Sequence, residues 1–277
     1  MSMGYDNMSR EEVFSQSKER KAHKEMKPNG VSVRECRDSE AHPNATPIQL
    51  YLDVTGSMGH IPHQMMKDGL PTLMGTLIQS GVPDAALLFG AVGDHECDRD
   101  PLQVGQFESG DEELDMWLTR TYLEGGGGGN EGESYLLGWY FAANHTATDA
   151  WDKRKQKGFV FTVGDEPVLK SVPISAIKEI MGDTAVGQAN WSAIELLSLA
   201  QEKNHVFHIF IEHGHRRLDD AWKQLLGSNL IVISDHNDVP KVIAQKVMET
   251  LGGQPVSVNV TPSSETFVKN DHTEIYL

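Results

Sequence analysis

The sequence predicts an α/β fold with a mostly parallel central sheet and helices on both of its faces. Short apolar segments typical of strands alternate along the chain with longer segments of helical periodicity, a pattern typical of such sheets. The segment 85–92 is apolar almost throughout, which favours a strand that is covered on both faces. The segment 47–54 ends in a group of oxygen-bearing side chains, at the sheet edge where open α/β sheets hold their ligands.

The first 46 residues form a polar segment rich in Glu, Lys, Arg and Ser, which we interpret as an N-terminal arm, 1–46. Ser9 and the acidic residues after it predict a helix from Arg10 to about Glu25. The alternating segment 31–36 predicts an edge strand. We expect this arm to be partly ordered, against the main domain or a partner.

The main domain is predicted at 47–252, and a C-terminal tail follows at 253–277. Alternating valines in the tail indicate either an edge strand or a mobile segment. The predicted strands are 47–54, 85–92, 104–107, 158–163, 205–212 and 229–234. The predicted helices are 60–79, which Pro71 bends or splits, 111–121, one from Glu133 or Ser134 to Asn144, 172–180, 190–201, 218–225 and 240–251.

Composition and charge limit the classes of partner. The chain has 277 residues, of which 39% are hydrophobic, enough for a sizeable core. Its formal net charge of −16 argues against nucleic acid as a partner, because phosphate binding needs clustered Lys and Arg. The same charge fits a cation-binding surface, a basic partner, or solubility alone.

Cysteine content and hydropathy bear on localisation. Cys36 and Cys97 are the two cysteines, too few for a disulfide framework, and they indicate a reducing compartment. No apolar run reaches the ~18 residues of a membrane span, and 1–20 is polar and charged. We therefore expect a cytoplasmic protein with no membrane partner, or a virion protein if a phage encodes it.

The candidate site begins where the first core strand ends. Asp53, Thr55 and Ser57 occupy alternate positions, and Gly56 between them permits a tight turn. One carboxylate and two hydroxyls form a hard, oxygen-only ligand set that suits Mg²⁺, Mn²⁺ or Ca²⁺. Asp165 follows another apolar strand, and the glycine-rich loop 125–134 carries further polar residues. Three loops at one edge of the sheet can therefore meet around one ion.

Three ordered segments resemble the von Willebrand factor A (VWA) domain. The run Asp53-Val54-Thr55-Gly56-Ser57-Met58 resembles the Asp-x-Ser/Thr-x-Ser signature that opens the metal-ion-dependent adhesion site (MIDAS) of this family. The loop 125–134 resembles the Gly-Gly-Gly-Asp-x-Pro-Glu loop of one VWA branch, the one found in alpha-kinase-associated and hemicentin-like proteins. In that branch the loop supplies the middle ligand of the site. Phe161-Thr162-Val163-Gly164-Asp165 resembles the strand that delivers the final Asp.

The resemblance spans 47–251 and includes Gly93-Asp94-His95, similar to a Tyr-Arg-Asp-His stretch of the same branch. It implies a doubly wound, Rossmann-like fold. The implied metal ligands are Asp53, Thr55, Ser57, Asn130, Glu131 and Asp165. Asn130 stands where Asp or Thr is usual, and Gly132 replaces Pro, so the middle ligand stays open among Asn130, Glu131 and Glu133.

The function implied by the resemblance is non-enzymatic: a bound divalent ion captures an Asp or Glu of a protein partner. Stand-alone proteins of this kind in bacteria and phages often act beside MoxR-type AAA+ ATPases as adaptors. This chain has no phosphate-binding loop of its own, so such an ATPase must act in trans.

Two other functions are open. One is a structural component of a phage or other assembly, with both terminal segments as docking tails. The other is a metal-assisted phosphohydrolase, which is disfavoured because hydroxyls stand where such enzymes place carboxylates. The histidines that flank the predicted strand 205–212 are interpreted as packing or surface residues; they are His205, His208, His213 and His215.

Overall fold

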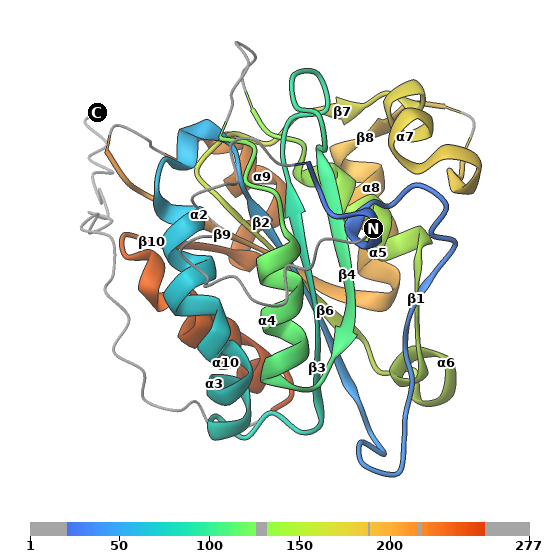
Figure 1. Ribbon diagram of the computed structural model, residues 1–277, viewed down its shortest axis with the longest axis vertical. Coiled ribbons are helices and arrows are strands. Elements are labelled where there is room, and N and C mark those ends of the chain that lie inside the picture. The colour runs from blue at the N-terminus through green and yellow to red at the C-terminus, as the bar shows by residue number, and fades with distance from the viewer. Residues whose placement is uncertain (1–20, 126–131, 188, 215–217, 253–277) are drawn as a thin grey trace, which may run out of the picture.

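Six strands form the central sheet of the computed structural model, which describes residues 21–125, 132–187, 189–214 and 218–252 (Figure 1). The strand order is β10-β9-β6-β2-β3-β4, and every neighbouring pair is parallel except β3 and β4. The strands are β2 (Thr46–Asp53), β3 (Ala85–Val92), β4 (Leu102–Glu108), β6 (Gly158–Gly164), β9 (Asn204–Ile211) and β10 (Leu230–Ile233). The predicted mostly parallel sheet is confirmed.

Strand β2 lies in the middle of the sheet and positions the candidate site. All eight of its residues are buried. The chain leaves β2 for β3 on one side and later adds β6 on the other side, so the order reverses at β2. Such a reversal opens a crevice at the carboxyl ends of parallel strands. Asp53 is the last residue of β2 and therefore lies at this crevice.

Helices cover both faces of the sheet, as predicted (Figure 1). One face packs against α2 (Ile61–Gln64), α3 (Leu73–Gln79), α4 (Asp111–Arg120) and α10 (Val239–Thr250). The other face packs against α5 (Tyr135–Asn144), α7 (Ile174–Met181), α8 (Ala193–Lys203) and α9 (Asp220–Leu226). Side chains of β2 alternate between the two cores, because successive residues of a strand point to opposite faces. Among the described residues, no helix is both long and apolar enough to cross a membrane.

The predicted helix 60–79 is broken, as Pro71 indicated. Between α2 and α3 lie a π-helical turn (Met65–Gly69) and a 3-10 turn (Leu70–Thr72). Proline lacks an N–H and its ring crowds the preceding turn, which prevents one continuous α-helix.

The described part of the N-terminal arm packs against the main domain. Its predicted helix does not extend to Glu25, because 21–23 have no regular structure and Lys24–Met26 form a 3-10 turn. The start of that helix and the tail 253–277 lie outside the described residues. Strand β1 (Arg34–Cys36) pairs in parallel with β5 (Thr146–Thr148). The predicted edge strand 31–36 is therefore present, but in a two-stranded sheet apart from the central one.

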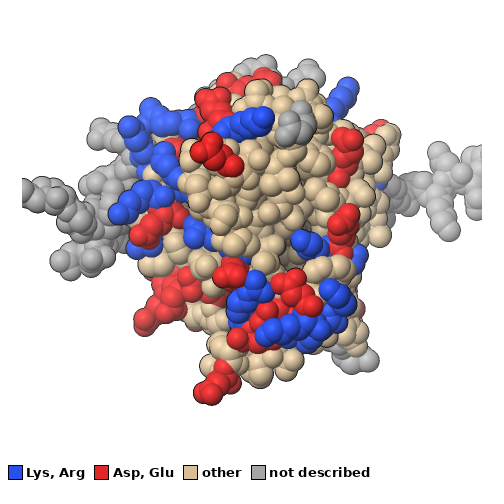
Figure 2. Space-filling view, turned by 90° about the vertical axis from the view of Figure 1, so that its right-hand side faces the viewer, with Lys and Arg blue, Asp and Glu red and all other residues tan. Residues whose placement is uncertain are grey.

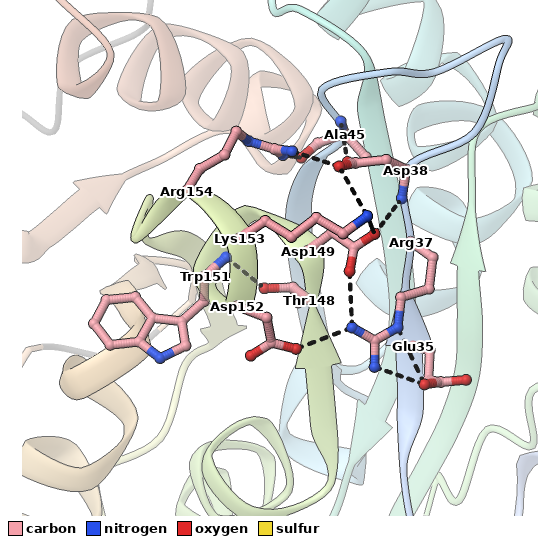
Figure 3. A network of polar contacts seen from close by, with 10 residues as sticks. All are labelled: Glu35, Arg37, Asp38, Ala45, Thr148, Asp149, Trp151, Asp152, Lys153 and Arg154. Carbon is pink, nitrogen blue, oxygen red and sulfur yellow. Dashed lines mark hydrogen bonds and ion pairs between the residues drawn. The ribbon is translucent and has the colours of Figure 1, made fainter.

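A network of charged residues connects the arm at Glu35, Arg37 and Asp38 to α6 (Asp149–Arg154), as Figure 3 shows. Arg37 Nη1 lies 2.9 Å from both Asp149 Oδ1 and Asp152 Oδ2. Arg154 Nη1 donates to Asp38 Oδ2 at 2.6 Å. Figure 2 shows Lys and Arg gathered with Asp and Glu on the lower part of one side of the molecule, below a broad uncharged area.

Candidate metal centre

A continuous series of short contacts joins the side chains at the carboxyl ends of β2 and β6. Asp53 Oδ1 accepts hydrogen bonds from the Thr55 backbone N–H at 2.9 Å and from Thr55 Oγ1 at 2.6 Å. Thr55 Oγ1 lies 3.1 Å from Ser57 Oγ. Ser57 Oγ donates to Asp165 Oδ1 at 2.8 Å. Four side chains that the sequence singled out therefore form one cluster.

The local sequence explains this convergence. Asp53 ends β2, and its carboxylate caps the N–H two residues later, an arrangement typical of Asx turns. Gly56–Met58 then form a 3-10 turn that brings Ser57 back towards Thr55. Gly59 closes the turn at φ 57°, a conformation that favours glycine.

Each hydroxyl of this cluster contacts an acid and the other hydroxyl. Thr55 Oγ1 lies within hydrogen-bond distance of Asp53, and Ser57 Oγ within hydrogen-bond distance of Asp165. The two hydroxyl oxygens lie 3.1 Å apart, and either can donate to the other. In an octahedral Mg²⁺ site with bonds of 2.0–2.1 Å, neighbouring ligand oxygens lie about 2.9 Å apart, so this separation also fits two ligands of one ion.

Burial disfavours the charged forms of two acids at the cluster. Burial raises the pKa of Asp53, and the charge of Asp165 adds to this, although hydrogen bonds from Thr55 and Tyr135 act in the other direction. Burial also raises the pKa of Glu133 well above its usual range, and the charges of Asp53 and Asp94 add to that effect. A bound cation would stabilise the charged forms of both acids.

Near the cluster, two buried carboxyl oxygens have no hydrogen-bond partner among the described residues: Glu133 Oε2 and Asp94 Oδ2. They fit a site that a cation completes. Among all the residues that the structure describes, no group of three or more His, Cys, Asp or Glu side chains is arranged to hold a metal. A metal here therefore depends on the hydroxyls of Thr55 and Ser57 together with the acids.

The middle ligand stays a prediction. Asn130 and Glu131 lie outside the described residues, whereas the carboxyl of Glu133 interacts with Thr55. Gly132, just before it, has φ 136°, and a Cβ there would lie 2.7 Å from the Pro167 carbonyl oxygen. The glycine thus allows the loop to approach the segment after β6 closely.

Sequence reasoning missed two residues that contact the acids. Tyr135 donates its hydroxyl proton to Asp53 Oδ2 at 2.7 Å, and His213 Nε2 lies 2.8 Å from Asp165 Oδ2. Tyr135 looked like the start of an apolar helix. His213 follows the strand 205–212, and its place at the same sheet edge as Asp165 is the signal that could have identified it.

A groove with a volume of about 1040 Å³ opens beside the cluster. Its lining is mostly apolar and includes His95, Val168, Leu169, Ile194, Leu197 and Leu225. His95 connects it to the cluster, because its backbone N–H donates to Ser134 Oγ, next to Glu133. The groove thus begins near the cluster, at His95 and at Pro167, two residues after Asp165, although none of the four clustered side chains lines it.

Comparison with solved structures shows what this architecture resembles. The pilus adhesin SpaC of Lactobacillus rhamnosus GG, in an open conformation, is similar with a TM-score of 0.50 and 9% identity. The similarity covers 78% of this chain and 31% of SpaC, so this chain spans about a third of the adhesin. The sequence itself matches no family model, and no curated protein matches it.

Two further structures align less closely. An aerotolerance-related membrane protein from Bacteroides fragilis NCTC 9343 has 13% identity and a TM-score of 0.43, over 74% of this chain and 99% of that chain. Proximal thread matrix protein 1 from the mussel byssus, with a zinc-occupied MIDAS motif, has 13% identity and a TM-score of 0.48. That similarity covers 79% of this chain and 49% of the mussel chain. At such identities a likeness concerns the fold alone, and the fold is doubly wound and VWA-like.

Proposed function

We propose that this chain is a non-enzymatic protein-binding module that grips its partner through a divalent cation in a MIDAS-like site. Asp53, Thr55, Ser57 and Asp165 would hold Mg²⁺, or Mn²⁺ or Ca²⁺ in its place, with a further ligand from the glycine-rich loop. The observation that carries the proposal is the convergence of two acids and two hydroxyls from the ends of β2 and β6 into one series of contacts no longer than 3.1 Å.

The ligand set explains why the target would be a carboxylate. When bound, the ion supplies a strong attraction for one more anionic oxygen, because two of its protein ligands are neutral hydroxyls. Thr55 and Ser57 fix the direction of this attraction, since each is held by an acid. An Asp or Glu of a protein partner is the group that fits. The groove beside the cluster leaves room for the surrounding segment of the partner.

The hydroxyls also favour binding over catalysis. Metal-assisted phosphohydrolases use carboxylate-rich sites, often with two metals, whereas two of the four clustered side chains here are hydroxyls. That the partner is a MoxR-type AAA+ ATPase stays a prediction from the sequence resemblance.

The test is a calorimetric titration of MgCl₂ into the metal-free protein, its Asp53→Ala and Ser57→Ala variants, and Ser228→Ala as a control. Ser228 is exposed, so its hydroxyl can be removed without touching the cluster. We expect Mg²⁺ binding to be lost in Asp53→Ala and Ser57→Ala and retained in Ser228→Ala. Pull-downs from the native cell with and without EDTA should show the same dependence. Unchanged binding and capture in both cluster variants would refute the proposal.

A further inference from the structure

Both acids of the cluster divide their two oxygens between an inner and an outer contact. Asp53 turns Oδ1 to Thr55 and Oδ2 to the hydroxyl of Tyr135 at 2.7 Å. Asp165 turns Oδ1 to Ser57 and Oδ2 to His213 Nε2 at 2.8 Å. In this arrangement each acid directs one oxygen to a hydroxyl of the cluster and the other oxygen to a residue outside it.

The outer contact of Asp53 is rigidly held. Tyr135 is fully buried, and its ring packs 4.9 Å from His208 and 5.5 Å from Trp222, measured between ring centroids. Its hydroxyl also accepts the Glu166 backbone N–H at 3.3 Å. Gly164 makes the approach possible, because a Cβ at that position would lie 2.0 Å from the hydroxyl oxygen. The backbone of 164–166 and two neighbouring rings thus fix this tyrosine.

The outer contact of Asp165 comes from the neighbouring strand. His213 lies two residues beyond the end of β9, which pairs in parallel with β6. Its side chain is 29% exposed, whereas that of Asp165 is fully buried. The imidazole therefore covers the outer oxygen of Asp165 from the solvent side, and its position is set by the pairing of β9 with β6.

We propose that Tyr135 and His213 decide which cation the centre accepts, by holding each carboxylate so that it can offer one oxygen only. The inference rests on the cation site proposed above. Mg²⁺ takes six ligands at short, nearly ideal distances, whereas Ca²⁺ takes six to eight and often uses both oxygens of a carboxylate. Carboxylates restricted to one oxygen each, combined with two hydroxyls, favour the smaller six-coordinate ion. Tyr135 and His213 are thus positioning residues that select Mg²⁺ over Ca²⁺.

The test compares dissociation constants for MgCl₂ and CaCl₂ in four variants. Tyr135→Phe removes only the hydroxyl, and His213→Ala removes the imidazole. His213→Gln restores an N–H close to the position of Nε2. Tyr140→Phe is the matched control. It also removes a hydrogen-bonded tyrosine hydroxyl from α5, but that hydroxyl contacts the backbone of Val186 and not the cluster.

We expect the preference for Mg²⁺ over Ca²⁺ to fall about tenfold in Tyr135→Phe and His213→Ala, mainly through tighter Ca²⁺ binding, as substitutions around metal ligands typically change affinity by this much. His213→Gln and Tyr140→Phe should keep the wild-type ratio. Infrared spectra of the Ca²⁺-loaded protein, with ¹³C-labelled aspartate, should show the carboxylate bands of the two altered variants moving towards the smaller splitting of two-oxygen coordination.

The outcomes separate this inference from the proposed function. If the wild-type protein binds neither ion, the cation site itself is wrong. If it binds Mg²⁺ through Asp53 but the ratio is unchanged in both Tyr135→Phe and His213→Ala, the selection by these residues is overturned and the site stands. Equal losses of affinity for both ions, with no rescue by His213→Gln, would overturn it as well.

Discussion

At Asp53, burial and hydrogen bonding act on the same carboxylate in opposite directions. Burial raises its pKa to about 7, although Thr55 and Tyr135 donate hydrogen bonds that favour the charged form. The hydrogen bonds therefore compensate for only part of the lost hydration. Without a cation, a charged Asp53 is a source of instability in the folded protein.

This gives a prediction for the metal-free protein. Between the ordinary carboxyl range near pH 4 and about pH 7, the folded state keeps a proton on Asp53 that the unfolded state releases. The free energy of unfolding should therefore fall as pH rises through this window. Asp53→Asn should remove this part of the slope, and the exposed control Glu202→Gln should keep it. Urea unfolding in EDTA at pH 5, 6, 7 and 8 measures the difference, and parallel slopes for wild type and Asp53→Asn would contradict it.

The residues of the cluster differ in how far the sequence could reveal them. Asp53, Thr55 and Ser57 lie within five positions, so a local turn decides their geometry. Tyr135 and His213 could not be identified in this way, because the hydrogen bonds that they make span 82 and 48 residues of chain. Tyrosine in an apolar helix and histidine after a strand are ordinary packing residues, and only tertiary structure reveals the oxygens that they meet.

Among the elements, α5 shows what periodicity could and could not reveal. A helix ending at Asn144 was predicted, and α5 ends there. Nine of its ten residues are buried, so no polar stripe indicates which side faces the sheet. Contact with β2 is close at Gly138, where a Cβ would lie 2.9 Å from the ring of Tyr51. Strand β5 and helix α6 were not predicted, because β5 is only three residues long and pairs with distant β1.

Gly138 should be necessary for this packing. Gly138→Ala forces the Tyr51 ring or α5 to move, and we expect unfolding free energy to fall by about 1–3 kcal/mol, as is usual for overpacked cores. Gly75→Ala in α3 is the matched control, because no atom lies within 4 Å of its added Cβ. It should leave stability unchanged or raise it by up to about 1 kcal/mol, since alanine favours helix. Urea unfolding compares them, and equal stability of the two variants would contradict the expectation.

For the whole molecule, the segment ahead of β2 is part of the folded structure where it is described. Met26 is fully buried in the core, and Thr121, directly after α4, contacts its sulfur at 3.4 Å. β1 then runs along β5, and Arg37 joins Asp149, 112 residues further along the chain. The domain boundary at 46/47 stays a prediction. Polar composition alone could not show which part of the arm would pack against the main domain.

Asp149 should control how firmly this segment is held. Lys153 donates to its carboxylate, and the Asp38 N–H and Arg37 do so from the arm, which holds the pKa of Asp149 well below its usual range. The contribution of Asp149 to stability is therefore complete at neutral pH and is lost only as pH falls below the usual carboxyl range near 4. Asp149→Asn should weaken the contacts at neutral pH, so that amide hydrogens of β1 exchange faster while those of β2 do not.

Asp152→Asn provides a sharp comparison, because Asp152 contacts the same Arg37 nitrogen at the same 2.9 Å. Its side chain is 50% exposed against 7% for Asp149, and exposed ion pairs contribute little. Exchange measured by mass spectrometry at neutral pH should therefore show faster exchange of β1 in Asp149→Asn and little change in Asp152→Asn. At about pH 2.5 the contrast should shrink, since the Asp149 carboxyl takes up a proton once its contacts open, and this uptake favours the open state of the wild type. Equal exchange of β1 in both variants at neutral pH would mean that the network does not hold the arm, and that pairing with β5 and burial of Met26 suffice.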